Sequence, residues 1–366
     1  MKTAKAAVYE GPERITIHEF PLPKIGVEDM LVEVAITGVD GTEVHMFRGE
    51  FDVLKETAPV IFGDEIIGQI LEIGEEARQR RKLQKGDLIS VEAKIPCHNC
   101  EFCNRGHYYL CETGKTYGWI SCKEPPHLWG GYSTHVFVPK QALVHRIPAG
   151  MDLNVALISS SVLANAYRWT ELAQIELGEP VVIIGPGPQG LCCTLLSHLR
   201  GAAPVIVIGL ERDAERLALA KQFGASNTIA ISPTMPQPEV INMVAEILGD
   251  TRPPVVMEGA GSQSAIDLAL SLVKPWGKIV SYSIAEPSRL MIDYNALLFK
   301  EVALIRPHSH PNTVDKALRL GQSLANRSFN LSKLITHSFP FEQAERAVRT
   351  AGYEYGERPM KVVLRP

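Results

Sequence analysis

The stretch VVIIGPGPQGL at residues 181–191 decides the fold. Four consecutive apolar residues predict a short buried strand, and the glycines after it stand at Gly185, Gly187 and Gly190 in the spacing G-x-G-x-x-G. Between a strand and a helix, the first glycine allows a tight turn and the second lets a pyrophosphate approach the backbone. The third lets the helix pack against the strand. The stretch therefore predicts a dinucleotide-binding site.

The residues that follow this turn indicate which dinucleotide it binds. The helix is expected to begin near Pro188, so the free N–H groups of its first turn, where Gln189 stands, would face the phosphates. Glu211 follows a second apolar strand, and a carboxylate there suits the ribose 2′-hydroxyl of NAD and repels the 2′-phosphate of NADP. Arg212 beside it could instead hold that phosphate. We expect NAD, with NADP as the alternative.

The chain around this motif alternates between strands and helices. Short apolar strands are expected at 181–184, 204–209, 227–231, 254–259, 278–284 and 302–307, with amphipathic helices between them. Continuous apolar strands separated by such helices indicate a parallel sheet covered by helices on both faces. Residues 156–299 are therefore expected to form a doubly wound Rossmann domain, entered through a helix over 154–175.

The sequence before residue 155 follows a different pattern. It consists mainly of strand-like segments with period-two alternation and Gly/Pro turns, and it shows no long helical period. We expect residues 1–155, completed by residues 300–366, to form a β-rich domain. The fold class is thus α/β, with a β-rich domain beside the doubly wound one.

Four of the seven cysteines lie close together in the β-rich part, within PCHNCEFCNRGHYYLC. Cys97, Cys100, Cys103 and Cys111 have the spacing with which four thiolates surround Zn²⁺ tetrahedrally. All four zinc positions would then be protein ligands, with none open for water. The loop 97–111 is therefore expected to hold a structural zinc.

Composition excludes several classes of function. The chain has 366 residues, of which 45% are apolar and 21% charged, and its net charge is −4. This charge supplies no field for holding nucleic acid or anionic lipid, and we expect neither partner. The N-terminus has no apolar signal core, and a four-cysteine cluster suggests a metal more than disulfides. We therefore expect a cytoplasmic protein that acts on a small molecule.

Taken together, these features resemble the medium-chain dehydrogenase/reductase family, in its zinc alcohol and polyol dehydrogenase branch. GVDGTEVHMFRGE (38–50) is similar to the family segment G-x-C-G-T-D-x-H, and PVIFGDEIIGQILEIG (59–74) to P-x-x-x-G-H-E-x-x-G. The resemblance covers essentially the whole chain. It implies a GroES-like β-rich catalytic domain, an NAD(P)-dependent dehydrogenase of small alcohols or ketones, and a homodimer or homotetramer.

The sequence departs from the family at its catalytic zinc. Relatives hold that metal with a Cys, the His of G-H-E, and a Cys or Glu on the helix that enters the cofactor domain. Here Asp40, Asp64 and Ser161 stand at these positions, and only the neighbouring Glu65 remains as an occasional ligand. Carboxylates and a hydroxyl do not reproduce the thiolate and imidazole ligands that Zn²⁺ prefers. We expect no catalytic zinc; the alternative is a hard-cation site of Asp40, Asp64 and Glu65.

The resemblance also implies a proton relay through Thr42 and His45. Asp40, Asp64 and Glu65 would crowd one pocket, and like charges there raise at least one pKa. We hypothesise that one of these carboxyls stays protonated and donates a hydrogen bond to the substrate oxygen. The alternatives are a conjugate C=C reductase, a redox-neutral epimerase or lyase with tightly bound NAD, and a non-catalytic cofactor-binding protein.

Overall fold

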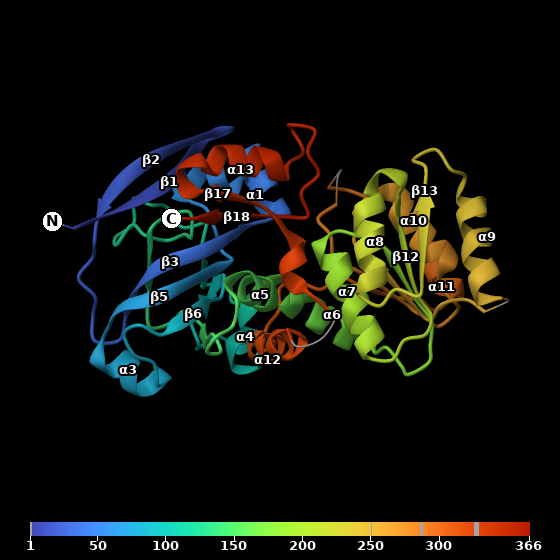
Figure 1. Cartoon of the computed structure of the whole chain (residues 1–366), viewed down its shortest axis with the longest axis horizontal. Coiled ribbons are helices and arrows are strands. Elements are labelled where there is room, and N and C mark those ends of the chain that lie inside the picture. The colour runs from blue at the N-terminus through green and yellow to red at the C-terminus, as the bar shows by residue number, and fades with distance from the viewer. Residues whose placement is uncertain (1, 250, 286–287, 326–328) are drawn as a thin grey trace. The chain divides into compact units, whose positions relative to one another are not determined.

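The computed structural model of the chain describes all residues except 1, 250, 286–287 and 326–328. The described chain divides into two compact units, which are drawn in Figure 1. The first unit holds the described residues up to Ser161 and most of those from Val314 onward. The second unit runs from Val162 to Thr313. None of the described helices is long and apolar enough to cross a membrane.

The second unit is built on a six-stranded parallel sheet. Its order is β13 (Asn227–Ile231), β12 (Val205–Leu210), β11 (Val181–Ile184), β14 (Val255–Glu258), β15 (Lys278–Ser281) and β16 (Ala303–Ile305). The helices are α6 (Ala164–Ala173), α7 (Pro188–Leu199), α8 (Ala214–Gln222), α9 (Gln237–Leu248), α10 (Gln263–Leu272) and α11 (Tyr294–Phe299). Strand order 3-2-1-4-5-6 defines the Rossmann fold. All four residues of β11 are buried, as expected for a strand with sheet neighbours on both sides and helices on both faces.

The first unit contains a mostly antiparallel sheet to which both ends of the chain contribute. Its order is β10 (Val144–Arg146), β6 (Leu88–Val91), β5 (Ile66–Ile73), β3 (Met30–Val39), β18 (Lys361–Arg365) and β17 (Ile335–Pro340), with β9 (His135–Val138) also paired to β3. A second sheet has the order β2 (Arg14–Pro21), β1 (Thr3–Gly11) and β4 (Val60–Ile61), and β7 (Lys94–Ile95) pairs with β8 (Lys115–Thr116). The C-terminal strand is thus an interior strand of a sheet that begins near residue 30.

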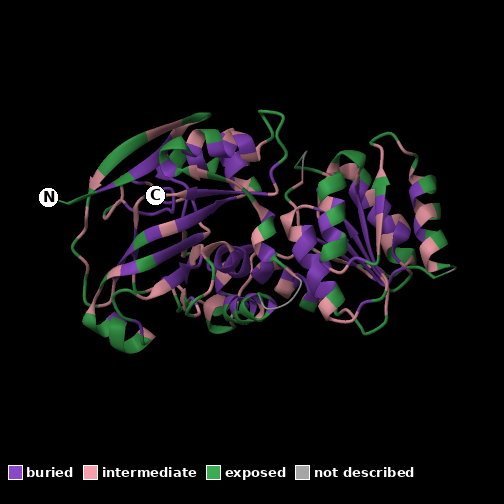
Figure 2. Ribbon diagram, in the orientation of Figure 1, coloured by how far each residue is buried: buried purple, intermediate pink, exposed green. Residues whose placement is uncertain are grey.

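Short helices surround these sheets. They are α1 (Gly41–Phe47), α2 (Val53–Thr57), α3 (Glu75–Arg81), α4 (Glu101–Asn104), α5 (Leu153–Ile158), α12 (Val314–Leu324) and α13 (Ala344–Ala351). The burial pattern in Figure 2 shows purple, buried residues along the central strands of the unit, with exposed residues concentrated on α3 and the outer strand β2. The largest fully buried side chains of the unit include Tyr117, Tyr132 and Phe62.

The helix expected over 154–175 has an irregular middle. It begins with α5, passes through a π-helical turn at Ser159–Leu163 and continues as α6. Asp152 caps the start of α5, because its side chain accepts hydrogen bonds from the N–H groups of Asn154 (2.9 Å) and Val155 (3.1 Å). A π turn inserts an extra residue into a helix and occurs frequently at functional sites. Here it contains Ser161.

Strand register brings the expected site residues together at one end of the large sheet. Strand β3 runs antiparallel to β5, with Thr37 opposite Ile66, and antiparallel to β18, with Val39 opposite Val362. The residue after β3 therefore lies beside the residues before β5 and the first residue of β18. These residues are Asp40, Asp64, Glu65 and Lys361.

Candidate active site

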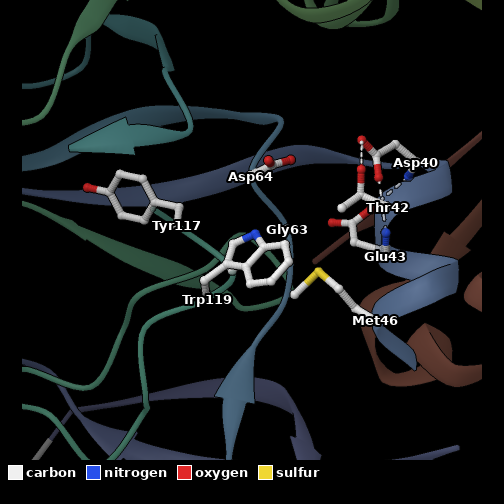
Figure 3. A pocket seen from close by; sticks show the side chains of 9 residues that line it. Asp40, Thr42, Glu43, Met46, Gly63, Asp64, Tyr117 and Trp119 are labelled. Atoms are coloured by element: carbon white, nitrogen blue, oxygen red, sulfur yellow. Dashed lines mark hydrogen bonds between the residues drawn. The ribbon is translucent and has the colours of Figure 1, made fainter. Parts of the chain in front are cut away.

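A small pocket lies at this end of the sheet (Figure 3). Its lining consists of Asp40, Thr42, Glu43, Met46, Gly63, Asp64, Tyr117, Gly118 and Trp119. All of them belong to the first unit. Three carboxyls and two aromatic rings therefore face the same small space.

Asp40 forms the start of helix α1. Its Oδ1 accepts the backbone N–H of Glu43 (3.1 Å), and Oε2 of Glu43 accepts the backbone N–H of Asp40 (2.7 Å), which makes a capping box. The hydroxyl of Thr42 donates to Oδ2 of Asp40 (3.4 Å). These bonds, dashed in Figure 3, fix the three side chains relative to one another. Asp40 thus stabilises the helix start as well as lining the pocket.

Asp64 stands apart from this hydrogen-bonded group. Figure 3 draws its carboxyl away from the hydrogen-bonded side chains of Asp40, Thr42 and Glu43. Burial raises the pKa of Asp64 well above its usual range, and the charges of Asp40 and Glu65 raise it further. This carboxyl is therefore suited to be protonated near neutral pH and to donate a hydrogen bond to a ligand.

Glu65 points away from the pocket into an ion pair. Its Oε2 lies 2.7 Å from Nζ of Lys361, and both side chains are at most 10% exposed. Burial lowers the pKa of Lys361, but the carboxylates of Glu65 and Asp40 outweigh it, so the pKa of Lys361 is raised. Burial raises the pKa of Glu65, and the Lys361 charge opposes that shift. The pair places one fixed positive charge behind the pocket.

Sequence reasoning missed three of these residues: Glu43, Lys361 and Tyr132. Burial raises the pKa of Glu43 well above its usual range, and Asp40 and Asp64 add to that shift. Oε1 of Glu43 and the hydroxyl of Tyr132 are buried without a hydrogen-bond partner among the described residues. The spacing of Asp40 and Glu43, three residues apart at a helix start, is a capping-box signal that could have identified Glu43. No local signal marks Lys361 or Tyr132.

The two expected relay residues both lie on α1. Thr42 lines the pocket, whereas His45, one turn later, does not. Nδ1 of His45 lies 2.6 Å from Oε2 of Glu50, which holds the imidazole in place. Ser161, which the resemblance assigns to the third ligand position, is buried, and its hydroxyl donates to the carbonyl of Leu157 (2.7 Å).

The four cysteines of the loop form the metal site that their spacing predicted. The Sγ atoms of Cys97, Cys100, Cys103 and Cys111 all lie within 4.8 Å of one another. The backbone N–H groups of Asn99 (3.4 Å) and Cys100 (3.3 Å) donate to Sγ of Cys97. Hydrogen bonds from Thr113 and from the Asn99 N–H lower the pKa of Cys97 to about 6, which favours its thiolate. This donor set fits a tetrahedral structural Zn²⁺.

The carboxyls of the pocket are less closely gathered than the four cysteines. Across the described residues, the four cysteines are the single group of at least three potential ligands gathered this closely. Asp40, Asp64 and Glu65 therefore do not present three donor atoms to one point. The geometry gives no support to a hard-cation site there.

The glycine turn fits a dinucleotide. Gly185 has a φ of +96°, and a Cβ on Gly190 would lie 2.0 Å from the carbonyl oxygen of Gly185, so both positions require glycine. At Gly187 a Cβ would meet nothing within 4 Å, which leaves open space in front of the turn. Helix α7 begins at Pro188, and the buried Oε1 of Gln189 has no partner among the described residues. The turn thus offers free polar groups and room for phosphates.

The expected ribose contacts follow strand β12. Glu211 and Arg212 lie in a 3₁₀ turn directly after the strand, and both are exposed. A Cβ on Gly209 would lie 2.7 Å from Cγ of Pro186, so the end of β12 lies close to the glycine turn. This arrangement leaves Glu211 and Arg212 accessible near the turn.

Comparisons with known proteins agree with this architecture. The family model of the alcohol dehydrogenase GroES-like domain matches residues 26–149, and that of the zinc-binding dehydrogenases matches residues 188–323. A probable alcohol dehydrogenase of Mycobacterium tuberculosis is 33% identical over 281 residues, which cover 75% of this chain and 74% of that protein. A sorbitol dehydrogenase of Bombyx mori is 27% identical, covering 94% of each chain.

Solved structures give the same result. An alcohol dehydrogenase of Thermotoga maritima superimposes with a TM-score of 0.87 at 28% identity, over the full length of both chains. A zinc-binding dehydrogenase of Sinorhizobium meliloti 1021, solved with NADP, has a TM-score of 0.82 at 25% identity, again over both full lengths. The chain belongs to the medium-chain dehydrogenase/reductase family, in its zinc-type alcohol dehydrogenase branch, and is an NAD(P)-dependent oxidoreductase of the alcohol type.

Proposed function

We propose that the enzyme transfers a hydride between the nicotinamide and a carbon of a small organic alcohol or ketone, without a catalytic zinc. The observation that carries the proposal is the pocket at Asp40 and Asp64, where two ligand positions of the family hold carboxyls. These oxygens and the hydroxyl of Ser161 are not the donors that Zn²⁺ selects. NAD bound at the glycine turn supplies the hydride acceptor.

In this mechanism the chain's own residues handle the substrate oxygen and its proton. Asp64, kept protonated by burial, donates a hydrogen bond to the oxygen and stabilises negative charge that develops on it. Thr42 lines the pocket and passes the hydroxyl proton along α1 toward His45. Glu50 holds His45 at the far end of this path.

Variants of the pocket test the mechanism. Asp64→Asn and Asp40→Asn should each lower kcat for ketone reduction by about tenfold or more, because a positioned proton donor contributes at least that much. The raised pKa of Asp64 predicts that reduction weakens as the pH rises through that pKa, and this limb of the pH profile should vanish in Asp64→Asn. Unchanged turnover in both variants would discard the mechanism. Panels of ketones and enones with reduced cofactor distinguish carbonyl reduction from C=C reduction.

Metal analysis tests the absence of catalytic zinc directly. The four cysteines account for about one zinc per chain. A second, stoichiometric zinc that the Asp64→Asn variant loses together with activity would contradict the proposal.

We propose NAD as the preferred cofactor because of Glu211. Titration of the enzyme with NADH and NADPH, followed by nucleotide fluorescence, should show tighter binding of NADH. Glu211→Gln should narrow that preference by removing the repulsion of the 2′-phosphate. Equal affinity of the unmodified enzyme for NADH and NADPH would contradict the proposed preference for NAD.

We also propose a cytoplasmic homo-oligomer. A site of four reduced cysteines suits a reducing compartment. The strand β16 ends the sheet of the second unit. Exposed apolar side chains stand in the segments that precede it in the chain, at Trp276, Met291, Tyr294, Leu298 and Phe299. The N–H of Trp276 donates to the carbonyl of Lys300 (2.6 Å), which joins the turn before β15 to the end of α11. A second copy that adds its own β16 edge would cover this surface.

A further inference from the structure

We propose that the pocket beside α1 binds a positively charged group of the substrate, so that the enzyme acts on a small amino alcohol or amino ketone. The identity of the reaction rests on the proposed function above. The recognition of a cation rests on the residues of the pocket and can be tested by itself.

The lining of the pocket holds three carboxyls and no cationic side chain that could balance a charge on them. Asp40, Glu43 and Asp64 all line it, and the residues described there include no lysine, arginine or histidine. Like charges held at close range in a buried place repel one another, and each costs free energy when it leaves water. A cationic ligand removes both costs, whereas a neutral or anionic one removes neither.

The ammonium group of Lys361 is already paired with Glu65. Nζ of Lys361 lies 2.7 Å from Oε2 of Glu65, and Lys361 does not line the pocket. One positive charge thus faces four carboxyls, counting Glu65 with the three in the lining. The ion pair neutralises Glu65 and leaves the other carboxyls for a ligand.

An unsatisfied carboxyl oxygen in the lining points to a ligand that carries hydrogen-bond donors. Oε1 of Glu43 is buried without a partner, although Glu43 is 4% exposed and its other oxygen is engaged in the helix cap. The hydroxyl of Tyr132 does not line the pocket; it is buried beside Glu43, and burial and the charges of Glu43, Asp40 and Asp64 raise its pKa. An ammonium group carries three N–H donors and no acceptor, so it matches a set of carboxyl oxygens. Charge-assisted hydrogen bonds of this kind are short and strong.

Aromatic rings complete the pocket. The indole of Trp119 lines the pocket and makes an edge-on contact with Phe51, at 5.2 Å between ring centroids. The hydroxyl of Tyr117 donates to the carbonyl of Phe137 (2.8 Å), so this polar group is already satisfied within the fold. A cation over the face of tryptophan gains a further attraction. The pocket is small, with a volume of about 10 Å³, which is room for one group of the size of an ammonium; the rest of the ligand would extend out of it.

A matched pair of ligands tests the proposal. 1-Amino-2-propanol and 1,2-propanediol have the same skeleton and the same secondary hydroxyl, but the first carries an ammonium at neutral pH. Their binding is measured by calorimetry on the zinc-loaded enzyme saturated with NADH, so that no turnover takes place. We expect the amino alcohol to bind at least about tenfold tighter than the diol. Equal affinities, or a preference for the diol, would overturn the proposal.

Variants of the pocket carboxyls test where the ammonium group binds. Asp64→Asn and Glu43→Gln should each reduce the preference for the amino alcohol to about threefold or less, because each removes one carboxylate. Glutamine at position 43 can still accept the cap hydrogen bond of Asp40, so α1 should remain formed. Retained binding of the diol and of NADH shows that each variant is folded. Glu56→Gln removes an exposed carboxylate of the same unit outside the pocket and is the control.

If Glu56→Gln lowers the preference as much as Asp64→Asn does, the effect is long-range and the proposal fails. It also fails if the preference depends on a second bound metal that a chelator removes. A cation that ionises a carboxyl displaces its proton to solvent. The binding enthalpy should therefore vary with the ionisation enthalpy of the buffer, and less so in Asp64→Asn.

The outcomes separate this proposal from the proposed reaction. If neutral ketones are reduced and the amino alcohol binds no tighter than the diol, the proposed reaction is supported and the proposed recognition of a cation is refuted. If the amino alcohol binds with the expected preference but no alcohol or ketone is converted with NAD or NADP, the recognition of a cation is supported and the proposed reaction is refuted.

Discussion

Gly38 lies directly beside the buried ion pair of Glu65 and Lys361. It lies in β3, between β5 and β18, and a Cβ there would be 1.8 Å from Oε2 of Glu65 and 3.1 Å from Cε of Lys361. The two charged side chains therefore meet across the strand above an α-carbon that has no side chain. Glycine is needed here for close approach and not for a left-handed turn.

Removal of the ammonium should be costly. Lys361→Met leaves Glu65 buried without its cation, and breaking a buried pair in this way costs about 3–5 kcal/mol. Urea unfolding followed by fluorescence measures the loss, with the exposed Lys123→Met as the control. A loss below about 1 kcal/mol would show that the pair contributes little to the stability of the fold.

At the scale of elements, a partly buried histidine, His145, joins strand β10 to helix α12. Nε2 of His145 lies 2.7 Å from Oε1 of Glu92, and Nδ1 lies 2.8 Å from Oδ1 of Asp315. The hydroxyl of Tyr108, in the cysteine loop, donates to Oε2 of Glu92 (2.8 Å). Burial lowers the pKa of His145, but the bonds to Asp315 and Glu92 outweigh it and raise the pKa to about 9.

This histidine predicts how stability depends on pH. Because the pKa of His145 is higher in the folded state than the usual value near 6.5, its contribution is fully present below about pH 6.5. It is lost as the pH rises toward 9, by up to about 3 kcal/mol at 1.36 kcal/mol per pKa unit. Unfolding free energies measured from pH 6 to 9.5 should show this decline. His145→Gln should flatten it, and the same slope in that variant would assign the decline to other groups.

The cysteine loop is the other element with a direct test. Metal analysis should find about one zinc per chain, bound by Cys97, Cys100, Cys103 and Cys111. Cys103→Ser, or removal of zinc by a chelator, should lower the melting temperature, because metal binding contributes to folding free energy. Cys122→Ser, at a cysteine outside the loop, is the matched control. A melting temperature that stays unchanged without zinc would show that the loop folds by itself.

For the whole molecule, the exposed apolar surface predicts self-association. Tyr294 and Phe299 are 80% and 83% exposed on α11, the helix that precedes the edge strand β16 in the chain. We expect a dimer or tetramer in solution by light scattering. Replacing both residues by glutamate should yield monomers, because like charges would then face each other across the interface. Unchanged mass would place any interface elsewhere.

Sequence patterns predicted the parts of the molecule that are local in the chain. The apolar segments expected as strands of the second unit are β11 to β16, and their parallel sheet has the expected helices between them. The four cysteines lie close together because at most seven residues separate each ligand from the next. Local spacing carries this information, since strand length and a tight ligand loop depend on neighbouring residues.

The sequence by itself determined the buried strands, the glycine turn and the close spacing of the four cysteines. Only the tertiary structure decided that Lys361 pairs with Glu65, that Glu43 and Tyr132 carry unsatisfied polar atoms, and that three carboxyls share one pocket. The reason is physical. These contacts depend on the register of β18 and β5 against β3, which joins residues almost 300 positions apart, and on burial that no local pattern specifies.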